Sequence, residues 1–361
     1  MNPFAPRRLG PLAAFAALLA LLAPAAVAAA QGSPVASPAT GDAPVPVEFP
    51  RDDGPHDALT EWWYYTGHLF TEEGERYGFE FVFFKGKRGV LEGYAAHFAI
   101  TDNPRRQFRY DQRIVPARGV SRPADGFDLT IGDWAMRGAN GNDALRAAMP
   151  GYAIDLRLES EKPPALHDGD GYIAYGDGTA SYYYSRTRMA VEGTLTVDGA
   201  ERAVMGEAWM DHQWGDFETY EEGGWDWFAV QLEDGTDLML YLIRDPEGGV
   251  VLVDGSYVDE EGDLTVLEAE GFAIEATETW TSERTDTTYP NRWIVKYPDQ
   301  ELALTLTPSL PDQELDTSRT TGVTYWEGEV EIEGTRGGEE IAGLGYVELT
   351  GYAPVEELGR P

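Results

Sequence analysis

The chain has 361 residues, of which 27 are basic and 63 acidic, so its formal net charge at pH 7 is -36. This charge would repel a polyphosphate partner, which excludes nucleic-acid binding, and it disfavours attraction to an anionic membrane surface. The chain has no cysteine, which excludes disulfides, thiolate metal sites and cysteine nucleophiles.

The N-terminus has the layout of a secretory signal peptide. Two arginines precede an apolar run at 11–30, and small residues at its end suit cleavage. We therefore predict a signal peptide at 1–30, a flexible linker rich in Pro, Ala and Ser at 31–48, and export to the periplasm or the extracellular space. The apolar run approaches the length that spans a membrane, so an uncleaved anchor is the alternative and the one membrane contact that we expect.

The rest of the chain is expected to consist of β-strands. Aromatic and β-branched residues alternate with polar ones at short intervals, and turn signals such as Glu73-Gly74 and Asp234-Gly235 separate the segments. The predicted strands are 62–70, 77–84, 93–101, 127–135, 152–159, 181–197, 203–211, 225–233, 237–244, 250–258, 271–280, 291–297, 301–307, 323–333 and 343–353. No window after the signal peptide shows convincing helical periodicity. The pattern predicts an all-β protein made of antiparallel barrels or sandwiches.

Two parts of the chain resemble each other weakly, and the length suits two domains. An aromatic segment at 62–65, a Gly turn and a second strand are echoed by the aromatic segment at 225–228 and its own Gly turn. This favours two related barrel-like halves, although a chance match of two aromatic hairpins is an alternative. We predict an N-terminal domain at 49–216 and a C-terminal domain at 217–361.

One segment in the middle of the chain interleaves Glu207, Asp211 and His212 with Trp209 and Trp214. A carboxylic acid held against indole surface loses hydration and stays protonated to a higher pH than in water. This arrangement suits a site where an acid acts beside an apolar ligand. The alternative is a polar strand end with two core tryptophans.

Alternation sorts the side chains of each predicted strand onto two faces. Near the first predicted strand, Glu61 and Trp63 share one face, whereas Trp62 and Tyr64 share the other. His97 lies between two alanines on its face, which predicts space near its imidazole. Aromatic walls that carry a few acids and imidazoles are typical of a small barrel that encloses a ligand.

The candidate ligand-binding residues are expected to meet between the two domains. They are Glu61, Trp62, Tyr64, His68, Tyr94, Glu207, Trp209, Trp214, Trp225 and Trp227. The alternative is structural: the histidines are satisfied members of an aromatic core, and Glu61 and Glu207 are acceptors that tie neighbouring strands together. Their nearest candidate partners are then Arg186 and Arg188.

Other chemistries fit the sequence less well. The five histidines lack the spacing of a zinc motif, so a zinc site could form only by long-range assembly, and no metal is predicted. The segment 167–171 with Asp177 offers oxygen ligands but lacks the final Glu of a calcium loop, so we expect a hairpin turn there. No serine lies in a nucleophile-elbow motif, and no Gly-rich segment between a strand and a helix indicates a nucleotide, so no cofactor is expected.

Several ordered motifs carry a family resemblance. They are Gly54-x-His56-x4-Glu61-Trp62-Trp63-Tyr64-Tyr65-Thr66-Gly67-His68-Leu69, Ala96-His97-Phe98-Ala99-Ile100-Thr101-Asp102, Gly206-Glu207-Ala208-Trp209-Met210-Asp211-His212-Gln213-Trp214-Gly215 and Gly345-Tyr346-Val347-Glu348-Leu349-Thr350-Gly351-Tyr352. From about residue 50 to 355 the chain resembles the AttH-like family, which includes carotenoid 1,2-hydratases (hydroxyneurosporene synthases) and exported proteins labelled predicted secreted hydrolases. The resemblance implies two lipocalin-like (calycin) antiparallel β-barrel domains.

The resemblance also implies candidate chemistry. In the hydratase branch, water is added across an isolated isoprenoid double bond without a redox cofactor. By that resemblance Asp211 is the candidate proton donor, His212 or His97 holds the water, and indole faces shelter the cation. Related barrels also serve as shape templates for pericyclic reactions. Three functions stay open: an exported protein that binds an apolar or amphipathic, isoprenoid-like small molecule, a cofactor-independent hydratase or lyase, and a hydrolase.

Overall fold

The computed structural model describes residues 44–88, 91–117, 123, 125–175, 179–217 and 223–353. The predicted signal peptide and most of the predicted linker lie outside these residues, as does Asp177. Within the described ranges, no helix has both the length and the apolar character needed to cross a membrane.

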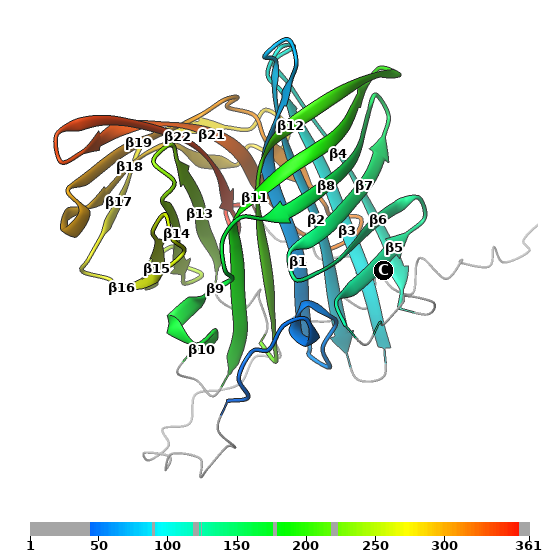
Figure 1. Cartoon of the computed structure of the whole chain (residues 1–361), viewed down its shortest axis with the longest axis horizontal. Coiled ribbons are helices and arrows are strands. Elements are labelled where there is room, and N and C mark those ends of the chain that lie inside the picture. The colour runs from blue at the N-terminus through cyan, green and yellow to red at the C-terminus, as the bar shows by residue number, and fades with distance from the viewer. Residues whose placement is uncertain are drawn as a thin grey trace, which may run out of the picture.

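Two antiparallel sheets contain all the strands (Figure 1). The first sheet comprises β1 (Thr60–Thr71), β2 (Arg76–Arg88), β3 (Leu91–Asp102), β4 (Gln107–Pro116), β5 (Phe127–Ile131), β6 (Trp134–Ala139), β7 (Asn142–Met149), β8 (Tyr152–Ser160), β9 (Ala165–Leu166), β10 (Tyr172–Ala174), β11 (Ala180–Val197) and β12 (Ala200–Gly215). The second comprises β13 (Gly224–Leu232), β14 (Asp237–Arg244), β15 (Val250–Val258), β16 (Leu264–Leu267), β17 (Ala273–Thr281), β18 (Thr288–Tyr297), β19 (Leu302–Pro308), β20 (Glu314–Asp316), β21 (Thr324–Arg336) and β22 (Glu339–Leu349). Within the described part of the chain, the helices are the short 3-10 turns η1 (Arg51–Asp53), η2 (His167–Gly169) and η3 (Pro298–Gln300). The all-β fold is therefore confirmed.

The two sheets follow the same strand order. The first runs β4-β3-β2-β1-β12-β11-β8-β7-β6-β5, and the second runs β16-β15-β14-β13-β22-β21-β19-β18-β17. In each sheet the first strand lies between the second strand and the last one, so β1 is flanked by β2 and β12, and β13 by β14 and β22. The shared order is consistent with two barrel domains and gives the weak sequence echo a structural counterpart.

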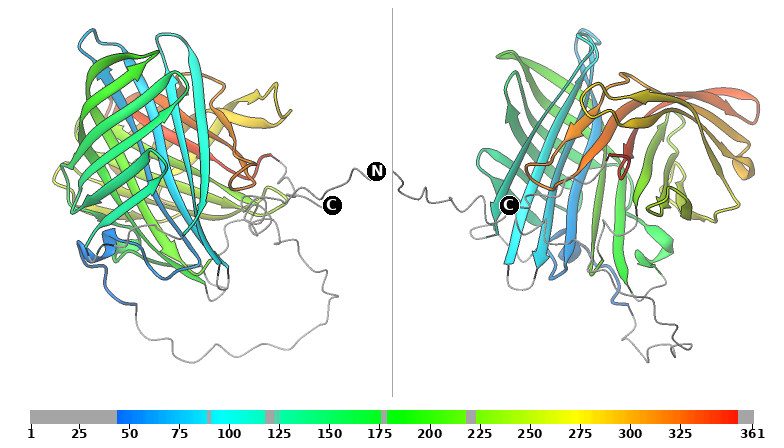
Figure 2. Two further views of the ribbon diagram at one scale, coloured as in Figure 1. Left: turned by 90° about the vertical axis from the view of Figure 1, so that its right-hand side faces the viewer. Right: turned by 180° about the vertical axis from the view of Figure 1, so that it is seen from behind.

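The first sheet curves into a nearly closed barrel (Figure 2). Its end strands approach each other at Arg113 of β4, which donates a 3.1 Å hydrogen bond to the carbonyl of Ile131 and lies over the ring of Trp134. Large apolar side chains that point inward fill the barrel. They include Trp63, Tyr65, Phe79, Phe81, Phe83, Tyr94, Phe98, Trp134 and Tyr184.

The second sheet has its own apolar core and packs against the first. Trp293 and Trp326 are buried in that core. The contact between the sheets includes β1, β2, β3 and β11 on one side and β13, β14, β21 and β22 on the other. Close approach depends in part on Gly78, because a Cβ there would lie 2.4 Å from the hydroxyl of Tyr346.

Some predicted elements differ from the structure. The strand predicted at 127–135 is two strands, because Gly132 adopts a positive φ of 67° and the chain turns between β5 and β6. Strands β4, β7, β9, β10, β16 and β20 were not predicted. The hairpin turn expected at 167–171 is also wrong: η2 follows β9 there, and both β9 and β10 pair with β11.

Candidate active site

Neighbouring residues of β12 face opposite sides of the first sheet. Asp211 faces the second sheet, where it accepts a hydrogen bond from Tyr183. His212 points into the first barrel and stacks on Trp63, with ring centroids 4.6 Å apart. Because successive side chains of a strand alternate, these two predicted site residues belong to different places in the molecule.

Four carboxyl groups gather between the sheets: Glu80 on β2, Asp211 on β12, Glu327 on β21 and Glu348 on β22. We call them the acid cluster. Glu327 and Glu348 are register partners on neighbouring strands. Burial is the largest cause that raises the pKa of Glu80 and of Glu327, and repulsion from Glu348 is the second largest. Among the described residues, no basic side chain is a cause of either shift. The cluster therefore lacks the counter-charges that normally accompany buried carboxylates.

Glu80 and Glu327 are buried, as is Asp211, but they have fewer hydrogen-bond donors than Asp211. Among the described residues, neither carboxyl oxygen of Glu80 has a hydrogen-bond partner, and the same holds for Oε2 of Glu327. Oε1 of Glu327 accepts a 2.8 Å hydrogen bond from the hydroxyl of Tyr64. Burial raises the pKa of both acids well above the ordinary value. Burial thus favours the protonated form of both side chains.

Glu348 is the half-buried member of the acid cluster, so part of this residue is accessible to solvent. The indole nitrogen of Trp225 donates a 2.7 Å hydrogen bond to its Oε2. Burial, together with repulsion from Asp211, raises the pKa of Glu348 to about 7 despite that bond. A carboxylic acid whose pKa lies near the working pH is suited to general acid–base catalysis.

Asp211 is held by more donors than the other members. Tyr183 and Trp209 each donate a 2.6 Å hydrogen bond to its carboxyl group, and Ser185 donates a third. Burial nevertheless raises its pKa to about 6. The carboxyl group is the acceptor in all three of these hydrogen bonds, which is the geometry of a positioned carboxylate.

Aromatic side chains surround the acid cluster. The ring of Trp227 makes edge contacts with Tyr64 at 5.3 Å and with Trp209 at 6.0 Å, and its nitrogen donates a 3.0 Å hydrogen bond to Tyr183. Those rings are buried, whereas other aromatic side chains that pack against them are partly exposed. The partly exposed aromatic residues are Trp62, Phe84, Tyr175 and Trp225. Apolar surface thus continues from the solvent side to the acids.

Two predicted histidines bridge the sheets as hydrogen-bonded residues. His68 lies 3.0 Å from Glu329, and both side chains are buried. His97 contacts the hydroxyls of Tyr325 at 2.8 Å and Thr320 at 3.0 Å, and burial lowers its pKa to about 3. The space expected beside its imidazole is occupied by side chains of the second sheet, because the small neighbours on β3 let that sheet approach.

Glu207 and Tyr94, also predicted site residues, lie away from the acid cluster. Glu207 is half-exposed and forms a 2.7 Å ion pair with Arg188, as expected for one of the two arginines. Arg186 instead pairs with Asp53 at 3.0 Å, so the expectation of an arginine partner for Glu61 is wrong. Tyr94 lies in the core of the first barrel.

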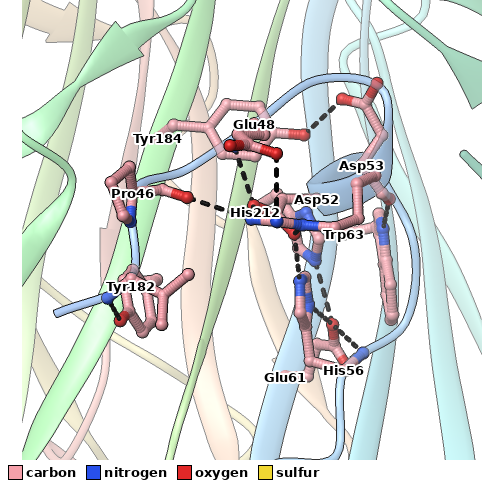
Figure 3. A network of polar contacts seen from close by, with 12 residues as sticks. Pro46, Glu48, Asp52, Asp53, His56, Glu61, Trp63, Tyr182, Tyr184 and His212 are labelled. Carbon is pink, nitrogen blue, oxygen red and sulfur yellow. Dashed lines mark hydrogen bonds and ion pairs between the residues drawn. The ribbon is translucent and has the colours of Figure 1, made fainter. Parts of the chain in front are cut away.

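Glu61 and His212 meet at the end of the first barrel beside η1 (Figure 3). Trp214 contacts His212, with ring centroids 4.8 Å apart. Oε1 of Glu61 lies 2.8 Å from Nδ1 of His56 and 3.1 Å from Nε2 of His212, and Oε2 accepts a 3.0 Å hydrogen bond from Lys85. Burial alone would raise the pKa of Glu61, but hydrogen bonds from the two histidines outweigh it and lower the pKa to about 2. We call His56, Glu61, Lys85 and His212 the barrel-end cluster.

Sequence reasoning missed Glu80, Glu327 and Glu348. Glu80 is the one acid of β2 and could have been noticed for that reason, whereas Glu327 and Glu348 lie on strands that carry further glutamates, so alternation alone does not single them out. Glu348 also lies inside one of the motifs that carry the family resemblance.

Comparisons with known proteins agree with this fold. The sequence matches the AttH-like family over residues 40–352. A crystal structure of an AttH protein from Nitrosomonas europaea is 32% identical, covers 86% of this chain and 98% of its own, and superposes with a TM-score of 0.78. The comparison with curated proteins finds no match.

More distant structures share the fold alone. Kievitone hydratase from Nectria haematococca is 18% identical, with 84% of this chain and 93% of that chain covered and a TM-score of 0.68. CghA with Sch210972 is 14% identical, with 84% and 90% covered and a TM-score of 0.56. The long family match and the identity to the Nitrosomonas protein are decisive: this chain belongs to the AttH-like family.

Proposed function

We propose that this AttH-like protein is a cofactor-independent acid–base enzyme that adds water across a carbon–carbon double bond of an apolar, isoprenoid-like molecule. The observation that carries the proposal is Glu348, a half-buried acid with a pKa of about 7 among aromatic side chains. The hydratase among the structural neighbours has the same fold and is consistent with this reaction class. We further propose, from the signal-peptide pattern at 1–30, that the protein acts after export.

The proposed reaction needs one proton donor and a sheltered cation. The π electrons of the double bond take the proton of the Glu348 carboxyl group, which leaves a carboxylate and a tertiary carbocation. Water then adds to the cation, and the proton that water releases returns to Glu348. Indole and phenol faces such as Trp225, Trp227 and Tyr64 would each stabilise the cation by about 1–2 kcal/mol when desolvated. Asp211, which was predicted as the proton donor, here positions the site and raises the pKa of Glu348.

A serine hydrolase is a poorer fit to the same region. Ser185 donates its hydrogen to Asp211, and His167 lies 2.6 Å from the serine oxygen. The serine thus lies between the carboxylate and the imidazole. A nucleophilic triad needs the imidazole in the middle, so that it can take the serine proton.

The test is incubation of the purified protein with a mixed isoprenoid and lipid extract in isotopically labelled water. We expect products that have gained one labelled water, formed at a rate that falls as pH rises through about 7, because only the protonated Glu348 can donate. Glu348→Gln is expected to lower the rate about 100-fold or more while ligand affinity changes only a few-fold. Glu340→Gln, an exposed change on the same strand, is the control.

The other outcomes are equally informative. Bound molecules that are returned without added water would replace the enzyme with a binding protein. Full turnover in Glu348→Gln would show that another group donates the proton. A joint fall of affinity and turnover would make Glu348 a binding residue.

A further inference from the structure

Three side chains at the barrel end bring possible metal ligands together. Nδ1 of His56, a carboxylate oxygen of Glu61 and a ring nitrogen of His212 all lie within 4.8 Å of one another. In the portion of the chain that the structure describes, no other group of three such side chains meets this condition. The residues come from the segment after η1, from β1 and from β12, which is long-range assembly of the kind that sequence spacing does not reveal.

The ligand set has a definite chemistry. Two imidazoles and one carboxylate form the protein side of many catalytic zinc sites and suit other divalent first-row metals. Ligand bonds of about 2.0–2.2 Å place such donor atoms about 3–3.5 Å apart. The observed separations are 2.8 Å from His56 to Glu61 and 3.1 Å from Glu61 to His212, so small side-chain shifts would admit an ion.

The surroundings hold the two imidazole rings in place. Trp214 stacks on His56 with ring centroids 3.9 Å apart and an interplanar angle of 2°, and Trp63 stacks on His212. Asp52 lies 3.3 Å from Nε2 of His56, the ring nitrogen that does not face Glu61. A carboxylate at the second nitrogen is a common means of orienting a metal-bound histidine.

Two further observations favour an ion over a closed structural contact. Among the described residues, the buried Nδ1 of His212 has no hydrogen-bond partner, so no existing bond prevents it from carrying the ring proton while Nε2, which faces Glu61, binds an ion. His56 is half-buried, so one member of the group is accessible to solvent, which could supply a water as the fourth ligand. Lys85 occupies Oε2 of Glu61 and leaves Oε1 for the metal.

We propose that His56, Glu61 and His212 bind one divalent transition-metal ion of the zinc class. The ion takes the place of the imidazole hydrogens that face Glu61: a neutral ring keeps its proton on its other nitrogen, and a protonated ring releases one proton to the solvent. The site is independent of the proposed hydration chemistry, because it lies on the opposite face of β1 and β12 from the acid cluster.

The test is titration of the untagged, chelator-treated full chain with Co²⁺ and, by calorimetry, with Zn²⁺. We expect one ion per chain and a visible Co²⁺ absorption spectrum typical of four or five ligands that include nitrogen. The half-buried His56 is the safest ligand to change, and His56→Gln should weaken binding about 100-fold or more. Asp52→Asn should weaken it about 10-fold to 100-fold through loss of ring orientation.

Matched controls separate a built site from weak surface binding. His97→Gln removes a buried histidine elsewhere, and Glu348→Gln removes an acid of the other cluster; both should bind Co²⁺ like the parent. Near-ultraviolet circular dichroism of the 10 tryptophans checks that each variant is folded. The proposal is overturned if the parent binds no stoichiometric ion, or if folded His56→Gln binds it as tightly as the parent.

Discussion

The acid cluster and the barrel-end cluster lie on opposite sides of β1 and β12, yet the acidities of their glutamates diverge. Glu61 lies against Lys85 and two histidines, and its pKa is about 2. Glu348 lies among other acids and aromatic rings, and its pKa is about 7. Burial raises the pKa in both places, so the partner, and not the depth of burial, decides which glutamate stays ionised.

The largest effect expected from this comparison is on folding stability at Glu61. Glu61→Gln removes the charge that compensates the buried Lys85, so we expect the free energy of unfolding at pH 7 to fall by about 3–5 kcal/mol. Urea denaturation followed by tryptophan fluorescence measures it. A loss below about 1 kcal/mol would mean that Glu61 is not the main partner of the lysine.

A change from Glu to Gln at Glu80, in the acid cluster, should not lower the free energy of unfolding as Glu61→Gln does. Because Glu80 has a raised pKa in the folded protein, the folded state holds a proton that the unfolded chain releases, and the stability of the parent falls as pH rises above the ordinary glutamate value. Glu80→Gln cannot lose that proton. We expect a change within about 1 kcal/mol at pH 5 and a growing advantage of the variant toward pH 9. Parallel stability curves with pH would contradict the neutral state of Glu80.

The smallest effect is expected at Glu207. Its side chain is 47% exposed in the ion pair with Arg188, and solvent screens such a contact. Glu207→Gln should change the free energy of unfolding by less than about 1 kcal/mol and leave hydration unchanged. A large loss of turnover would extend the proposed active site to the exposed end of β12.

Alternation along strands was the strongest guide that the sequence offered. It correctly separated Glu61 and Trp63 from Trp62 and Tyr64, because a single strand determines its own two faces. The same rule places Asp211 and His212 apart, although both had been assigned to one site because they are adjacent in the chain.

The sequence did not predict which residues of the two sheets contact each other. The bond from Tyr64 to Glu327 joins residues that are 263 positions apart, and no local pattern states which strand faces which. The acids of β21 and β22 therefore entered the candidate site only with the structure. His56 reached the barrel-end cluster for a similar reason, since the segment around η1 has no strand periodicity to predict its position.

The central claim is that the acid cluster keeps carboxyl groups protonated at neutral pH. Infrared spectroscopy of the protonated carboxyl stretch at pH 7 tests it directly, with the parent compared against Glu80→Gln, Glu327→Gln and Glu348→Gln. We predict a protonated-carboxyl absorption in the parent that decreases in each variant, most clearly at Glu80 and Glu327, and that weakens for Glu348 as pH rises above about 7. A parent spectrum without this absorption, or one that none of the three substitutions changes, would contradict the account.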